Sequence, residues 1–218
     1  MFHALTRWFV VLCAVVAVAT PAVAQTRIGF DDAWREQGFL RLFTNRYDLN
    51  GDQLGISSNK TVSLLWRPVD EANWASRSAR WAWRVDQGVP PTDLQQKGGD
   101  DRNIALYFVF VDEATARGLS RNTARGLLRH PNTRALVYVW GGDHTRGDVL
   151  SSPYHPYLAT HILRPAGVGA HRETVNLRAD FRAAFGAEPG VLVGLAVSAD
   201  SDDSRTKIRA GVSDLVIQ

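Results

Sequence analysis

The sequence predicts an all-β protein: an antiparallel two-sheet β-sandwich of the jelly-roll kind, with one or two short helical insertions. About ten short apolar runs are separated by clusters of Gly, Pro, Asn and Asp, which is the pattern of strands joined by turns. Two segments show helical spacing, but they do not recur between the strands. This arrangement disfavours a parallel sheet with alternating helices and favours two packed antiparallel sheets.

The first predicted strands form a hairpin. Residues 45–49 and 53–57 flank Asn50-Gly51-Asp52, and an Asn-Gly pair supplies the positive φ angles that a tight turn requires. Residues 61–67 are rich in β-branched and apolar residues and end at Pro68, which terminates a strand. We expect these three segments to be consecutive antiparallel strands.

Seven further apolar runs predict the remaining strands. They span residues 79–86, 103–111, 135–140, 160–163, 174–177, 191–197 and 212–217. Side chains alternate between the two faces of a strand, and residues 104–111 are apolar on both faces. We therefore expect this strand to be central and covered on both sides.

Two segments predict helices. In residues 113–129, Ala, Leu and Arg recur at helical spacing, and residues 178–185 form a short helical pattern that Gly186 closes. Both are insertions into the sandwich rather than elements of a repeating unit.

The N-terminus has the features of an export signal. Arg7 precedes an apolar run over residues 8–20, and Ala22-Val23-Ala24 is a small-x-small cleavage site. The run is shorter than the roughly 20 residues that span a bilayer. We expect residues 1–24 to be removed, which leaves residues 25–218 as one cysteine-free β-sandwich domain. The expected location is the periplasm or the exterior, with no membrane attachment after cleavage.

The charge composition argues against a nucleic-acid partner. The 218 residues include 25 Lys and Arg and 22 Asp and Glu, for a formal net charge of +3. The basic residues are spread along the chain, so the basic patch that nucleic-acid binding requires is missing. We expect no DNA or RNA partner, whereas a protein partner stays open.

Aromatic strands and an acidic loop indicate a ligand site. Adjacent Asp100 and Asp101 follow a Gly-Gly pair just before an apolar strand. They could hold Arg84 or Lys97 in a structural clamp, which is the favoured interpretation, bind a cation, or accept hydrogen bonds from sugar hydroxyl groups. Aromatic rings offer a flat apolar platform to the C–H face of a sugar, with Tyr107 and Trp140 as candidates, although core packing is the alternative for each ring. We predict that a ligand is bound by Arg84, Asp100, Asp101, Tyr107 and Trp140.

Two further acidic features are candidate sites. Asp200, Asp202 and Asp203 lie within one loop, where their mutual repulsion favours a cation such as Ca²⁺, although solvated turns also carry several Asp. Glu173 lies in a predicted strand, where a carboxylate that faces the interior needs an Arg or Lys partner. We expect His144 and His155, in a long loop, to be solvated.

Several of these motifs together resemble one bacterial family. They are Trp81-x-Trp83-Arg84, the Lys97–Asp101 loop, Tyr138-Val139-Trp140-Gly141, the stretch 178–189 and Asp200-x-Asp202. In combination they are similar to an exported family catalogued as domain of unknown function number three thousand and forty-seven. The resemblance implies a signal-bearing, single-domain β-sandwich related in general form to carbohydrate-binding jelly rolls. The chain departs from the family pattern at residues 167–170, at Phe181 and at Asp203.

Two functions follow as hypotheses. The first is a binding module for a carbohydrate or another polar envelope ligand, favoured because nucleophile, zinc and phosphate-loop signatures are missing from the sequence. The alternative is a polysaccharide-acting glycoside hydrolase or lyase with paired carboxylates, in which Asp100 or Asp101 would work with Glu173 or Asp86.

Overall fold

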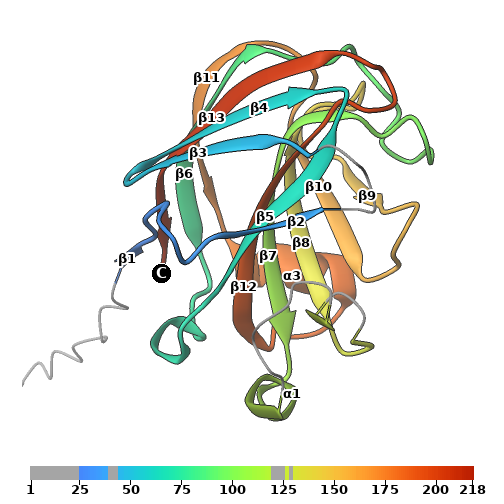
Figure 1. Cartoon of the computed structure of the whole chain (residues 1–218). Helices are drawn as coiled ribbons and strands as arrows, with labels where there is room; N and C mark the ends of the chain where they lie inside the picture. The colour runs from blue at the N-terminus through green and yellow to red at the C-terminus, as the bar shows by residue number, and fades with distance from the viewer. Residues whose placement is uncertain (1–24, 39–43, 119–125, 128–129) are drawn as a thin grey trace, which may run out of the picture.

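The computed structural model describes residues 25–38, 44–118, 126–127 and 130–218. Two sheets pack face to face in this part of the chain (Figure 1), which confirms the predicted jelly-roll-like β-sandwich with short helices. The predicted signal peptide, residues 1–24, lies outside the described residues and stays a prediction. Among the described helices, none is long and apolar enough to cross a membrane.

The first sheet has six strands. In spatial order they are β11 (Gly169–Val175), β6 (Ala79–Gln87), β13 (Lys207–Ile217), β4 (Gln53–Asn59) and β3 (Arg46–Asn50), and the short β1 (Thr26–Arg27) also pairs with β13. Neighbouring strands in this sheet are antiparallel. Its outer face carries polar side chains, because residues such as Arg80 and Arg84 of β6 alternate with buried ones.

The second sheet has seven strands. In spatial order they are β2 (Arg35–Gly38), β5 (Val62–Pro68), β12 (Val191–Asp200), β7 (Arg102–Val111), β8 (Arg134–Trp140), β10 (Leu158–Arg164) and β9 (Val149–Ser151). One pair departs from the antiparallel prediction, because β10 runs parallel to β8. The chain between them crosses the end of the sheet and places β9 at its far edge before it returns as β10.

The predicted hairpin is confirmed, but the third strand lies elsewhere. Asn50 pairs with Gln53, and Gly51 has a φ of 59°, which is the left-handed conformation that the turn requires. Lys60, with a φ of 59°, then turns the chain out of the first sheet. As a result β5 pairs with β2 and β12 in the second sheet rather than with its sequence neighbour.

Large aromatic side chains fill the space between the sheets. Trp81 and Trp83 point inward from β6, and both are about 2% exposed. The ring of Trp81 lies 6.0 Å from Phe108 and 5.7 Å from Tyr138, and that of Trp83 lies 5.7 Å from Trp140. These rings bury large apolar areas and dominate the core, so inward-facing residues of β6, β7 and β8 fix how the sheets stack.

Short helical segments lie outside the strands. The single-turn η1 spans Glu71–Asn73, α1 spans Glu113–Gly118, and the rest of the predicted helix 113–129 lies partly outside the described residues. The other predicted helix is confirmed as α3 (Leu177–Phe185), which Asn176 caps and which Gly186 ends at a φ of 66°. The run 174–177, predicted as a strand, contains the end of β11 and the first residue of this helix.

The start of β12 gives a test of the fold. Gly190 lies directly beneath the backbone of Val111, so a Cβ at this position would overlap the Val111 carbonyl oxygen. We expect Gly190→Ala to destabilise the protein by about 1–3 kcal/mol, because backbone cannot move aside as a flexible side chain can. The measurement is urea unfolding at equilibrium.

Gly118→Ala is the matched control, since a Cβ at Gly118 meets nothing within 4 Å. It should change the stability by less than about 0.5 kcal/mol. Equal unfolding midpoints for the two variants would contradict the close approach of β12 to the end of β7.

Candidate functional site

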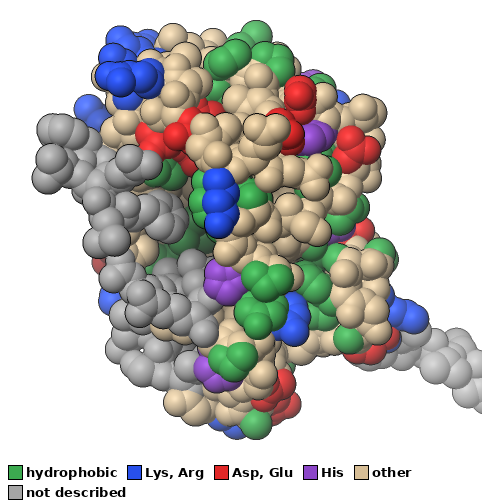
Figure 2. All heavy atoms as spheres, turned by 90° about the vertical axis from the view of Figure 1, so that its right-hand side faces the viewer, with side chains coloured by type: hydrophobic (Ala, Val, Ile, Leu, Met, Phe, Trp, Pro, Cys, Tyr) green, Lys and Arg blue, Asp and Glu red, His purple; other side chains and the backbone are tan. Residues whose placement is uncertain are grey.

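The outer face of the seven-stranded sheet carries a groove of about 550 Å³. In the space-filling view of the side that carries β9 and β10, hydrophobic side chains are visible at the bottom of a hollow and acidic side chains gather above it (Figure 2). This size is in the range of small-molecule binding sites.

Small residues on the central strand form the floor of the groove. Gly194 and Ala196 of β12 line it, and their side chains point away from the inter-sheet core because alternate residues face opposite ways. Trp66 of β5 and Tyr107 of β7 are the cross-strand neighbours of Ala196. A small side chain between two large rings leaves a furrow along β12.

The rest of the floor is aliphatic. It is lined by Val62, Leu64, Val109, Val137, Val139 and Leu158 from strands β5, β7, β8 and β10. Strand β7 is central and apolar on both faces, as predicted, and all of its residues except Arg102 and Tyr107 are buried. Tyr107 and Val109 of its outer face line the groove. Most of these side chains are buried, so the floor is a recessed apolar surface, which is typical of small-molecule sites.

One end of the groove is charged. Arg102, with a side chain 16% exposed, places Nη1 3.3 Å from Asp100 Oδ2 and 3.4 Å from Asp200 Oδ2. The two carboxylates are 11% and 9% exposed. Arg102 therefore joins the loop before β7 to the end of β12 and fixes two acidic side chains at the groove wall.

Hydroxyl groups extend this polar end. Arg102 Nη2 donates to Tyr107 Oη at 3.0 Å, and that hydroxyl lies 3.2 Å from Ser198 Oγ. Tyr154 Oη donates to Asp100 Oδ1 at 2.7 Å, and Lys97 Nζ lies 5.5 Å from the centre of the Tyr154 ring. Two loops thus meet over the end of the sheet.

Burial changes the acid–base properties of this end. Burial raises the pKa of Asp200, as do the neighbouring charges of Asp101 and Asp202, although Arg102 acts in the opposite direction. Burial and the hydrogen bond to Asp100 raise the pKa of Tyr154 to about 12. For Arg102, burial lowers the pKa, but Tyr107 and the two carboxylates outweigh it and the net direction is upward.

Asp101 lies beside this end but has a different environment. It is fully buried, and its two carboxylate oxygens accept hydrogen bonds from the backbone N–H groups of Asp203 at 3.3 Å and Ser204 at 2.7 Å. Oxygens of Asp101, Asp202 and Asp203 lie within 4.8 Å of one another. The sequence predicted Asp200, Asp202 and Asp203 as metal ligands. In the structure Asp101 takes the place of Asp200 in this cluster, and Asp200 faces Arg102.

The predicted ligand-binding residues separate into two groups. Asp100 and Tyr107 line the groove. Arg84 is instead on the outer face of the six-stranded sheet, where its side chain is 65% exposed and pairs with Asp86 at 3.1 Å. Trp140 is 2% exposed in the inter-sheet core, because the face it shares with Tyr138 is the one that packs on β6.

The carboxylates predicted for hydrolysis have different partners. Asp86 is on the other sheet with Arg84, and Asp101 holds the turn described above. Glu173, on β11, is only 2% exposed and pairs with Arg164 at 2.8 Å and with Arg146 at 3.0 Å. The expectation that Glu173 needs a cationic partner is confirmed, and this pairing places it away from the residues that line the groove.

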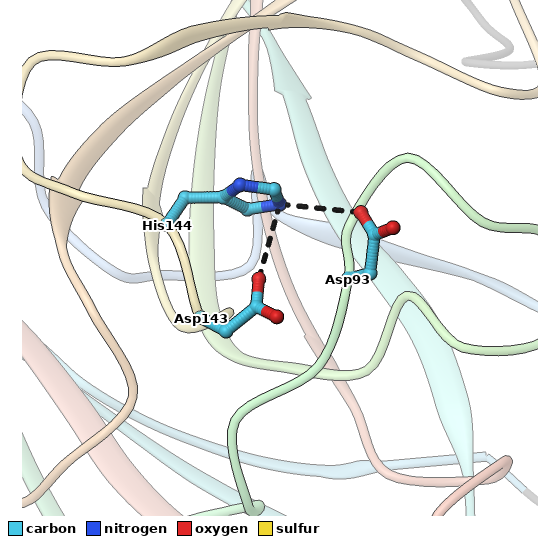
Figure 3. Close-up of side chains that lie close together, drawn as sticks. All are labelled: Asp93, Asp143 and His144. Atoms are coloured by element: carbon cyan, nitrogen blue, oxygen red, sulfur yellow. Dashed lines mark ion pairs between the residues drawn. The ribbon is translucent and has the colours of Figure 1, made fainter.

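A second cluster surrounds His144. Its Nε2 lies 3.4 Å from Asp93 Oδ1 and 3.5 Å from Asp143 Oδ1 (Figure 3). The same nitrogen accepts a hydrogen bond from the Leu94 N–H at 3.2 Å, and the side chain is only 16% exposed. The prediction that His144 is solvated is therefore wrong: it packs on the loop before β7.

Other groove residues were missed by sequence reasoning. Trp66, Ala196 and Arg102 were not selected, although a signal was present in Gly194-x-Ala196-x-Ser198, which places small residues on one face of an otherwise bulky apolar strand. Such spacing marks a close approach or a furrow. Tyr154 carries no such signal, because its role depends on where two loops meet.

A family model decides how the chain is classified: the model described as "Protein of unknown function (DUF3047)" matches residues 32–216. The chain belongs to the DUF3047 family. No curated protein matches the chain at a significant level.

Solved structures of similar arrangement include two enzymes. The xyloglucanase domain of NopAA, a type three effector from Sinorhizobium fredii in complex with cellobiose, has a TM-score of 0.47 and 8% identity, covering 85% of this chain and 92% of that one. The family 11 xylanase from Neocallimastix patriciarum has a TM-score of 0.41 and 13% identity, covering 89% and 95%. These identities are far below the level at which a shared ligand or activity follows.

Glu173 provides a pH-dependent test of the buried ion pairs. Burial raises the pKa of Glu173, but hydrogen bonds and charges from Arg146 and Arg164 outweigh it, so the net direction is downward. A lowered pKa stabilises the fold above the ordinary pKa of an unfolded Glu, about 4.3, and this stabilisation disappears as the pH falls through the lower folded value. We expect Glu173→Gln to cost about 2 kcal/mol at pH 7 and progressively less below pH of about 4.

Thermal and urea unfolding at several pH values measure this difference. Glu188→Gln is the control, because Glu188 pairs with Arg178 and Arg182 at the surface, with a side chain 55% exposed. It should have little effect at any pH. A constant loss for Glu173→Gln from pH 7 to pH 3 would contradict a carboxylate that is ionised in the folded state.

Proposed function

We propose that this DUF3047 protein is a binding protein and that its groove takes an amphiphilic ligand. An apolar body would lie along β12, and a hydroxyl-bearing head, such as a sugar, would lie at the charged end. One observation carries this proposal: a groove of about 550 Å³ has a mainly apolar floor and a charged end. A ligand that matches this groove has an apolar part at one end and a polar part at the other.

The floor favours an aliphatic part over a bare glycan. Burial of each methylene group contributes about 0.8 kcal/mol, and most of the floor is made of Val and Leu side chains and of Ala196. A polysaccharide would instead lose water from its hydroxyl groups above side chains that offer no hydrogen bond, which is costly. A sugar can still stack its C–H face on Trp66 or Tyr107.

The charged end favours a neutral head with hydroxyl donors. Asp100, Asp200, Asp202 and Asp203 line the groove there, and carboxylate oxygens accept hydrogen bonds from hydroxyl groups. Arg102 is already engaged with Asp100, Asp200 and Tyr107. An anionic head would meet net negative charge at this end, so acidic lipids and free fatty acids fit less well than a glycoside.

The proposed place of action is the cell envelope or the exterior. The sequence features of residues 1–24 support export. Glycan-bearing amphiphiles are components of bacterial envelopes, so the ligand class and the proposed location agree.

Isothermal titration of the full chain tests the ligand class. Octyl glucoside, below its critical micelle concentration, should bind saturably at one site. Glucose should bind at least about tenfold more weakly, because two buried methylene groups alone are worth that factor. Octanoate should also bind more weakly, because it lacks the hydroxyl groups and its carboxylate meets negative charge. Equal affinity for glucose would contradict the role of the apolar floor, and the lack of any binding would contradict the groove as a site for this class.

A pair of variants locates the site. Ala196→Leu fills the furrow between Trp66 and Tyr107 and should weaken octyl glucoside binding at least about tenfold, because a bulkier side chain displaces the alkyl chain. Ala82→Leu is the matched control, since Ala82 is half-buried in β6 of the other sheet and pairs with Arg172 and Ser213. Equal losses for both variants would place the ligand elsewhere.

A further inference from the structure

We propose that Asp101, Asp202 and Asp203 bind one Ca²⁺ ion at the polar end of the groove. Carboxylate oxygens of these three residues lie within 4.8 Å of one another. Asp202 and Asp203 also line the groove, but the ion would be held by protein side chains, so its binding can be measured with the groove empty.

Two segments far apart in the sequence build this cluster. Asp101 immediately precedes β7, whereas Asp202 and Asp203 lie in the turn between β12 and β13. The turn is fixed over Asp101 by the hydrogen bonds from the N–H groups of Asp203 and Ser204. The carboxylates are therefore positioned by backbone contacts, which lowers the entropy cost of ordering them around an ion.

Asp200 supplies an independent sign that a cation belongs here. Its side chain is 9% exposed, and Oδ2 faces Arg102 at 3.4 Å. Its other oxygen, Oδ1, is buried and has no hydrogen-bond donor among the described residues. Asp101 and Asp202 are close enough to repel it. A buried carboxylate oxygen with acids beside it and no donor is costly, and a cation among these carboxylates removes that cost.

Arg102 does not provide the missing positive charge for the whole cluster. Its hydrogen bonds and ion pairs in the described structure go to Asp100, Asp200 and Tyr107. Asp101 instead accepts from backbone N–H groups of the turn.

Donor type and spacing favour Ca²⁺ over other metals. All the donors are oxygens, which suit hard cations rather than Zn²⁺ or Cu²⁺. Ca²⁺ binds oxygens at about 2.3–2.6 Å, so two ligands on opposite sides of the ion lie about 5 Å apart, which covers the observed spread without rearrangement. Mg²⁺ would need the carboxylates to close to about 4 Å in near-octahedral geometry. Water molecules would complete the coordination shell.

The His144 cluster is a weaker candidate and serves as the control. Its Nε2 already accepts the Leu94 N–H, and Asp93 Oδ1 accepts the Gln95 N–H at 3.0 Å. The Asp93 and Asp143 side chains are 38% and 54% exposed, so water solvates them. No buried orphan oxygen is found there among the described residues.

Calorimetric titration of chelator-treated full chain with CaCl₂, in the absence of any groove ligand, tests the site. We expect one ion per chain with a dissociation constant on the order of 10⁻⁴ to 10⁻³ M, as in other extracellular modules. Asp203→Asn should weaken binding at least about tenfold, whereas Asp143→Asn should leave it unchanged. Ca²⁺ should also raise the unfolding temperature of the wild type.

Several outcomes would overturn the proposal. The first is that folded protein binds no Ca²⁺ at about 10⁻² M, which is tenfold above the expected range of dissociation constants. The second is that Asp143→Asn weakens Ca²⁺ binding as much as Asp203→Asn does. The third is that Mg²⁺ binds more tightly than Ca²⁺. Circular dichroism checks that Asp203→Asn is folded, and Asp202→Asn replaces it if it is not. Because no amphiphile is present, failure here leaves the octyl glucoside result unaffected, and the converse also holds.

Discussion

The structure depends on the packing of bulky side chains between two sheets, each of which buries its inner face in this contact. Trp81 and Trp83 of β6 meet Phe108, Tyr138 and Trp140 of the other sheet, and this contact buries one face of the seven-stranded sheet. The opposite face of that sheet is also apolar, and its side chains line the groove. The groove therefore lies on the outer face of the seven-stranded sheet.

The charged end follows from where the central strands start and stop. Asp200 ends β12 and pairs in register with Arg102, which begins β7. Charged residues at this edge keep contact with water, whereas the middle of the strands is restricted to apolar or small residues. The Arg102–Asp200 ion pair therefore links the ends of β7 and β12 and places charged groups at one end of the groove. The acidic turn after β12 adds further negative charge beside this pair.

Local sequence signals predicted local structure well. The Asn50-Gly51 turn and the helix closed by Gly186 both formed as expected, since each depends on a residue that tolerates positive φ. Alternation correctly assigned side chains to opposite faces, but it does not say which face is covered. For this reason Trp140, predicted as a ligand platform, is in the core, whereas Trp66 and Ala196 were missed. The placement of β5 in the second sheet and the parallel pairing of β8 with β10 depend on contacts between residues far apart in the sequence, which no short motif encodes.

A crystal structure of the full chain with octyl glucoside tests the central claim most directly. The account predicts that the alkyl chain lies along β12 between Trp66 and Tyr107, with the glucose hydroxyl groups against Asp100. Glucose seated over Ala196 with the alkyl chain in solvent, or a ligand bound on the six-stranded sheet, would contradict it.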